Sequence, residues 1–233
     1  MQKESPHSFL AALLHLSDPT LPIGGYVHSN GLETYVQQDI VHSTATAQEF
    51  VTNMLTYNVK YNDASLVRLA YEAAGAADIG ALVELDQECS ALKSPREIRE
   101  ASQKLGVRLL KIFQRKRSSA LAEAFDRQIK EKEAEGHYCI AFGLLAQQLC
   151  IPLHDALLAF YYNAAAGLIT NAVKLVPLGQ LDGQDLMLDL QPVFYQLAED
   201  TLLVNRELVG LCNIAFDVRC MQHERLYSRL YMS

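Results

Sequence analysis

The run from Ala156 to Val173 constrains this chain most, because it carries no charged residue over 18 positions. Eighteen residues are just enough for a helix to cross the apolar core of a membrane. The run is nevertheless rich in alanine, and it includes Asn163 and Asn171, which suit a protein interior better than lipid. A helix that is apolar on all sides is typical of the buried centre of a large helical protein. We therefore expect a central core helix between Pro152 and Pro177, and no membrane span.

Apolar residues recur at helical spacing along most of the remaining chain, and no alternating strand pattern of useful length appears. The sequence therefore predicts an all-α fold of about ten helices around a buried central helix. No linker or composition shift divides it, so we expect a single domain over residues 1–233, with a flexible N-terminus at about 1–7.

Three helix boundaries have sequence signals. Ser94, Pro95 and Glu97 stand at the N-cap, N1 and N3 positions of a predicted capping box. Pro192 is expected to kink or split the helix in which it lies. The last long helix is predicted to run from about Arg206 to beyond residue 221.

The one long irregular segment is the loop from Ser17 to Gly31. Pro19 and Pro22 each remove a backbone donor, and Gly24 and Gly25 permit positive φ angles or a close backbone approach. Between them lie the apolar residues Leu21, Ile23, Tyr26 and Val27. Such a loop either packs on its own domain or binds another surface.

The C-terminal segment, residues 222–233, is also unusual. It contains the apolar or aromatic residues Tyr227, Leu230 and Tyr231, interleaved with Arg225 and Arg229. Tyrosine and arginine dominate the energetics of protein interfaces. The segment either folds back on its own core or contributes to a partner-binding surface.

Composition excludes some classes of function. The net charge of −7 argues against binding to nucleic acid, because phosphate backbones bind basic surfaces. No basic leader with a short apolar core begins the chain, so we expect no secretory signal. The five cysteines include no CxxC motif, which fits a reducing, cytoplasmic setting.

No catalytic motif was found. No glycine-rich loop carries a lysine at P-loop spacing, and HExxH and nucleophile-elbow motifs are absent. The weak candidates for metal ligands are His28 in the loop, and Cys220 and His223 near the C-terminus; His137 and Cys139 form a further pair of suitable donors. A structural site needs about four ligands, so plain packing and hydrogen bonding remain the alternative for each of them.

Four motifs resemble the urease accessory protein UreF family. They are LSDPTLPIGGYVHSNGLE at 16–33, KLGVR at 104–108, VKLVPLGQ at 173–180 and MQHERLYSRLYMS at 221–233. The first is long and specific, and together the motifs span nearly the whole chain.

This resemblance implies an all-α, cytoplasmic, non-catalytic assembly factor that forms a homodimer. Its implied partners are UreD (also called UreH), the GTPase UreG and apo-urease, into which nickel is inserted with GTP hydrolysis by UreG. Nickel would pass through the complex, and no cofactor would be bound stably.

The resemblance also implies partner-binding residues. The loop motif contributes Tyr26, His28, Ser29 and Glu33, and the C-terminal motif contributes Arg229 and Tyr231; Lys174 matches the core-helix motif. With Arg225 and Tyr227, these are the candidate partner-binding residues. Two alternatives stay open: a stand-alone metal carrier, and an all-α enzyme that uses His28 with a carboxylate such as Asp18 or Glu33.

Overall fold

The computed structural model describes residues 7–232, and all regular structure in that range is helical, which confirms the predicted all-α class. The α-helices are α1 (Leu10–Leu16), α2 (Leu32–Gln37), α3 (Thr44–Asn53), α4 (Ser65–Gly75), α5 (Ile79–Leu92), α6 (Arg96–Gln114), α7 (Ala120–Lys130), α8 (Tyr138–Gln148), α9 (Leu153–Leu175), α10 (Gln180–Asp189), α11 (Gln191–Leu202) and α12 (Ile214–His223). A π-helix, η2 (Met54–Ala64), joins α3 to α4, and η1 (Gly25–Val27) and η3 (Arg206–Leu208) are single 3-10 turns. Of the expected flexible N-terminus, residues 1–6 lie outside the described range.

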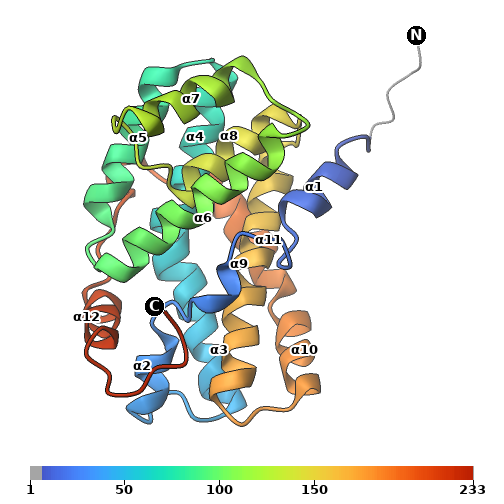
Figure 1. Ribbon diagram of the computed structural model, residues 1–233. Helices are drawn as coiled ribbons and strands as arrows, with labels where there is room; N and C mark the ends of the chain where they lie inside the picture. Colours follow the sequence, from blue (N-terminus) through green and yellow to red (C-terminus); the bar gives the residue numbers. More distant parts are fainter. Residues whose placement is uncertain (1–6, 233) are drawn as a thin grey trace.

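Helix α9 runs through the middle of the molecule and contacts most of the other helices, including α2, α3, α10, α11 and η2 (Figure 1). Among the described helices it alone is long and apolar enough to cross a membrane, but 56% of its most apolar 18-residue window is buried inside the protein. Tyr161 is fully buried there, and its hydroxyl lies 2.7 Å from the hydroxyl of Thr201 on α11. The predicted core helix is therefore confirmed.

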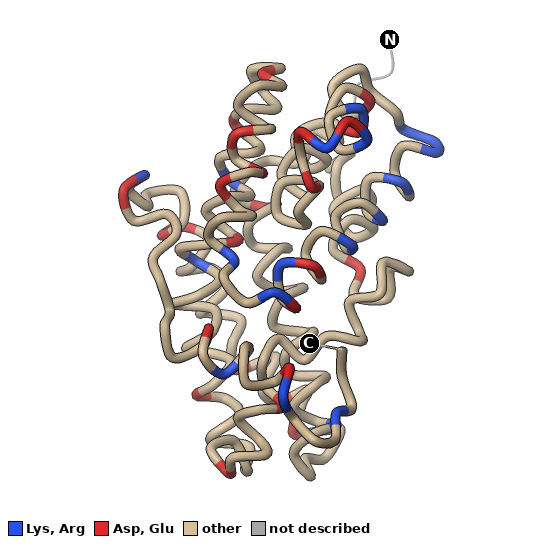
Figure 2. The backbone as a smooth tube through the Cα atoms, turned by 60° about the vertical axis from the view of Figure 1, so that its left-hand side comes forward, with Lys and Arg blue, Asp and Glu red and all other residues tan. Residues whose placement is uncertain are grey.

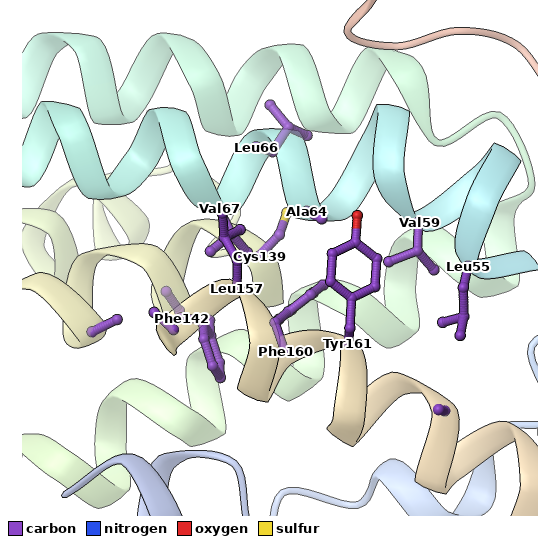
Figure 3. Close-up of a cluster of buried hydrophobic side chains, with 14 of the residues drawn as sticks. Leu55, Val59, Ala64, Leu66, Val67, Cys139, Phe142, Leu157, Phe160 and Tyr161 are labelled. Carbon is purple, nitrogen blue, oxygen red and sulfur yellow. The ribbon is translucent and has the colours of Figure 1, made fainter. Parts of the chain in front are cut away.

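The core continues from α9 to α4 and α8. Val67, Phe142, Leu157 and Phe160 lie together in one buried cluster (Figure 3). The rings of Phe142 and Phe160 meet edge to face, with centroids 5.1 Å apart, an arrangement that aromatic pairs prefer. This packing holds α9 in place, and α9 in turn contacts the Ser17–Gly31 loop that follows α1.

The predicted capping box before α6 is wrong. The helix begins at Arg96 with Pro95 at the N-cap, and no side chain caps it. The Glu97 carboxylate instead reaches across to His223 and Arg229 in the C-terminal region. The guanidinium of Arg229 and the ring of His223 together offer the carboxylate stronger interactions than one backbone amide, which explains the difference.

The last helix is shorter than predicted. Residues 206–208 form only the turn η3, and α12 does not begin until Ile214. Gly210 between them has a φ of +87°, a left-handed conformation that a continuing right-handed helix cannot include. The expected break at Pro192 does occur, because α10 ends at Asp189 and Pro192 lies in the first turn of α11.

Acidic and basic residues are interspersed along the helices (Figure 2). Exposed pairs such as Lys104 with Glu100, at 3.4 Å, illustrate the mixing. Among the described residues no continuous basic track of the kind that follows a phosphate backbone is visible in this view.

Candidate functional site

The Ser17–Gly31 loop and the C-terminal segment lie against each other, and the end of the chain runs beside α2 (Figure 1). The backbone N–H of Met232 donates to the carbonyl of Val27, with N···O 2.9 Å. The side-chain amide of Gln37, at the end of α2, donates to the carbonyl of Ser228 at 2.9 Å. Of the two alternatives for the C-terminal segment, the structure has it folded back on its own chain.

Side chains from two long helices fix the backbone of the loop. On α6, Arg108 donates to the carbonyl of Ile23 at 2.8 Å. On α9, Asn163 donates to the carbonyl of Ser17 at 2.9 Å, and Asn171 donates to the carbonyl of His28 at 2.8 Å. The polar residues of the core helix thus satisfy loop carbonyls that the fold has turned away from solvent.

Two loop glycines are required by the backbone. Gly24 and Gly31 have φ angles of +92° and +79°, a region that other residues rarely occupy. A Cβ atom on Gly31 would lie only 2.7 Å from the sulfur of Cys220 on α12. Gly31 therefore lets α12 pack directly against the start of α2.

Glu33 on α2 is the main anchor of the C-terminal segment, although only 4% of its surface is exposed. Its carboxylate accepts the backbone N–H of Leu230 at 2.7 Å and that of Tyr231 at 3.1 Å. It also lies 3.1 Å from Nε2 of His223. Hydrogen bonds to a charged acceptor are the strong ones, so a single side chain holds two consecutive amides in place.

Glu97 on α6 completes the network from the other side. One carboxylate oxygen lies 2.7 Å from Nδ1 of His223, and the other accepts from Arg229 at 2.7 Å. Both ring nitrogens of the buried His223 therefore face carboxylates. The imidazole can donate to both only when it carries both protons, in which case two positive and two negative groups balance.

The structure divides the candidate partner-binding residues into two groups. Those that are exposed are Tyr26, Lys174, Arg225, Tyr227 and Arg229. Those that are buried within the chain are His28, Ser29, Glu33 and Tyr231. In this conformation the first group can contact a partner, whereas the second can only support the surface from beneath. Lys174 lies in the last turn of α9, one turn after the Asn171 that binds the carbonyl of His28.

The surroundings of His28 disfavour its charged form. Burial lowers the pKa of the imidazole, and the positive charges of Lys104 and Arg108 lower it further. Only 7% of the residue is exposed. A neutral His28 therefore suits a supporting role beneath the loop at neutral pH.

The weak metal candidates do not assemble into a site. Within residues 7–232, no group of three or more His, Cys, Asp or Glu side chains is arranged to hold a metal ion. His223 faces two glutamates, and the imidazole of His137 lies 2.8 Å and 3.1 Å from the hydroxyls of Ser90 and Ser102.

The two carboxylates considered as partners for a catalytic His28 are both engaged elsewhere. Asp18 accepts from the backbone and the hydroxyl of Thr20, at 2.8 Å and 2.7 Å. Glu33 binds the C-terminal segment. The Asp18 contacts stabilise a local turn, and the Glu33 contacts hold the C-terminal segment. Neither arrangement supports the enzyme alternative.

A cavity of about 410 Å³ lies behind the loop. Its lining includes His28 from the loop, Asn171 from α9, and the ion pair between Lys93 and Asp63, whose Nζ···O distance is 2.8 Å. The wall thus mixes amide, charged and apolar groups around a space large enough for several water molecules.

Sequence reasoning missed four residues that make this site: Glu97, Arg108, Asn163 and Asn171. Each acts on a segment distant in sequence; Glu97 and His223, for example, are 126 positions apart. No local spacing could reveal these contacts. The one available signal was that Asn163 and Asn171 are polar residues in an otherwise apolar helix, which requires hydrogen-bond partners.

Comparison with known proteins now identifies the family. The family model for UreF matches residues 41–191. A urease accessory protein UreF from Actinobacillus pleuropneumoniae serotype 3 (strain JL03) is 50% identical over 224 residues, covering 96% of this chain and 99% of the relative. The chain belongs to the UreF family. A UreF from Haemophilus influenzae (strain PittGG) is 51% identical, with 96% and 95% of the two chains covered, and one from Bacillus sp. (strain TB-90) is 31% identical, with 96% and 99% covered.

The part of the chain that matches the UreF model spans α3 to α10. The Ser17–Gly31 loop and the C-terminal segment lie outside that match, on the two sides of it. The helices that match the UreF model thus form the main part of the protein. The two ends of the chain pack against these helices and are joined by the hydrogen bonds and ion pairs of Glu33 and Glu97.

Proposed function

We propose that this chain is a non-catalytic accessory protein that scaffolds a complex of UreD (or UreH), itself and the GTPase UreG on apo-urease, for GTP-dependent nickel insertion. Family membership supports the role in urease assembly. The observation that carries the scaffold proposal is the joining of the loop and the C-terminal segment into one surface, through the hydrogen bond between Met232 and Val27.

That surface has the chemistry of a binding site. Tyr26 is 68% exposed and Tyr227 is fully exposed, and Leu230 and Met232 also present apolar side chains to solvent. Beneath them Glu33 holds the backbone, and Glu97 holds the side chain of Arg229. Exposed aromatic groups on a backbone that is already held suit partner binding, because less of the chain must be ordered on association.

Nickel enters this proposal as cargo. The chain would hold no fixed metal, and the ion would pass through the assembled complex to urease. GTP hydrolysis would belong to UreG, since no P-loop motif occurs in the present sequence. A cytoplasmic location and a homodimer belong to the same proposal, and light scattering after size-exclusion chromatography tests the dimer.

The central experiment is co-purification with UreD (or UreH), followed by addition of UreG. We expect Arg229→Ala, or deletion of residues 224–233, to leave the helical circular dichroism unchanged and to abolish co-purification. Arg127→Ala, at an exposed position on α7, which packs on α5 and α6, is the matched control. Normal complex formation by both Arg229→Ala and the protein that lacks residues 224–233 would exclude the C-terminal segment as a binding element.

The same preparation separates the alternatives. Stoichiometric nickel that survives dialysis of the isolated protein would favour a metal carrier. Turnover of a small molecule by the isolated protein, lost in His28→Ala, would favour an enzyme. We expect neither.

A further inference from the structure

A pair of cysteines lies in the core, away from the loop and the C-terminal segment. The sulfurs of Cys89 on α5 and Cys139 on α8 are 3.6 Å apart, and both side chains are fully buried. Figure 3 shows the sulfur of Cys139 among the apolar side chains between α4 and α9. The contact is close to that of two touching thiols, and an ordinary S–S bond would require the sulfurs to approach by only about 1.5 Å.

The helices that carry the two sulfurs are held in a fixed relation. The carboxylate of Asp86, one turn before Cys89, accepts the backbone N–H groups of Gly136 and His137 at 3.1 Å and 2.7 Å. Those residues directly precede α8. These hydrogen bonds tie α5 to the start of α8 beside the two cysteines.

The surroundings activate one sulfur. The hydrogen bond between the two thiols, with the positive charge of Lys93 and a contribution from His137, outweighs burial and lowers the pKa of Cys89 to about 6. Burial raises the pKa of Cys139, which therefore keeps its proton. The thiolate is the reactive form of cysteine, so the pair combines a nucleophile with a neighbouring thiol.

We propose that Cys89 and Cys139 form a redox-active dithiol, which hydrogen peroxide oxidises to an intramolecular disulfide. The Cys89 thiolate attacks one peroxide oxygen, which breaks the O–O bond and gives a sulfenic acid and hydroxide. The Cys139 sulfur then attacks the Cys89 sulfur, forming the S–S bond. The hydroxyl of the sulfenic acid leaves with the Cys139 proton as water. The two thiols lose two electrons in total, and the peroxide gains them.

The cavity behind the loop brings a small oxidant near the pair, although neither sulfur lines it. Lys93, one turn after Cys89, and Tyr138, next to Cys139, both line this space of about 410 Å³. Hydrogen peroxide is only slightly larger than water, so among oxidants it needs the smallest opening to reach two fully buried sulfurs.

The test uses the full-length protein with Cys150→Ser and Cys212→Ser, which removes the two exposed thiols. The folded protein is treated with millimolar hydrogen peroxide at pH 7, alkylated after denaturation and mapped by mass spectrometry. We expect one cross-linked peptide that joins residues 89 and 139, reversed by dithiothreitol. Cys220 is the internal control. It is buried without a second sulfur, burial raises its pKa, and it should remain fully alkylated.

The proposal fails if residues 89 and 139 stay alkylated after treatment, or if the cross-link forms only once the protein has been unfolded. A second variant, Cys139→Ser on the same background, should give no cross-link and should leave a sulfenic acid on Cys89 that dimedone traps. Equal dimedone labelling of Cys89 and Cys220 in this variant would show that Cys89 is not activated. Circular dichroism confirms that the variant is folded.

Discussion

The carboxylate of Glu33 and the imidazole of His223 lie 3.1 Å apart, although 190 positions separate them in the chain. This contact brings the first turn of α2 to the last turn of α12. With Glu97 on α6 it closes a network that holds the end of the chain against the Ser17–Gly31 loop. The stability of the surface should therefore depend on a few buried charges.

Glu97→Gln should loosen the C-terminal segment. The change removes the negative charge that faces both His223 and Arg229. We expect it to lower the free energy of unfolding by about 1–3 kcal/mol, the usual cost of losing charged hydrogen bonds. Amide hydrogen exchange in residues 224–232 should rise markedly.

The matched control is Glu100→Gln, one turn further along α6. Glu100 is half-exposed and forms an ion pair with the exposed Lys104, so its loss should change stability by less than about 0.5 kcal/mol. Equal hydrogen exchange in the two variants would show that the Glu97 contacts do not hold the segment.

Gly31→Ala should destabilise the protein, because alanine disfavours a φ of +79° and its Cβ would collide with Cys220. A loss of about 1–3 kcal/mol is expected in chemical denaturation. Gly25→Ala serves as the comparison, since a Cβ there meets no atom within 4 Å. Similar losses at the two positions would contradict the close packing of α12 on α2.

Tyr26→Ala and Tyr227→Ala should weaken partner binding without loss of stability. Both rings are exposed, so the melting temperature should not move measurably. If they are interface anchors, each change should reduce affinity for UreD (or UreH) at least tenfold in surface plasmon resonance. Tyr57→Ala, at a ring of similar exposure on η2, should bind normally; a comparable reduction in that variant would point to a general effect.

Stability should fall in mild acid because of His28. Its folded-state pKa is lowered, chiefly by burial, so the unfolded chain binds a proton first, at about pH 6.5. The stabilisation from a neutral His28 is thus complete above that pH and declines as the pH falls toward the folded-state pKa. Urea denaturation between pH 7.5 and 5.5 should show a weaker pH dependence for His28→Gln than for the unaltered protein. Identical slopes would mean that the pKa of His28 is the same in the folded and the unfolded chain.

The sequence by itself determined the fold class and the central helix. An uncharged run of 18 residues that is rich in alanine and contains Asn163 and Asn171 favours a helix buried in a protein core. The helical spacing of apolar residues can be recognised within any short stretch of the sequence. The loop was also visible locally, because Pro19, Pro22 and Gly24 exclude regular structure wherever they occur.

Only the tertiary structure decided how the two ends of the chain are used. Read locally, Glu97 forms a capping box and residues 206–221 form one long helix. The folded chain instead gives the carboxylate the side chains of Arg229 and His223 to bind, and it breaks the helix at Gly210. Likewise, nothing near Glu33 in sequence indicates that it will hold the amides of residues 230 and 231. Such contacts depend on groups brought together by burial of the core, and a buried charge takes whichever partners the packing supplies.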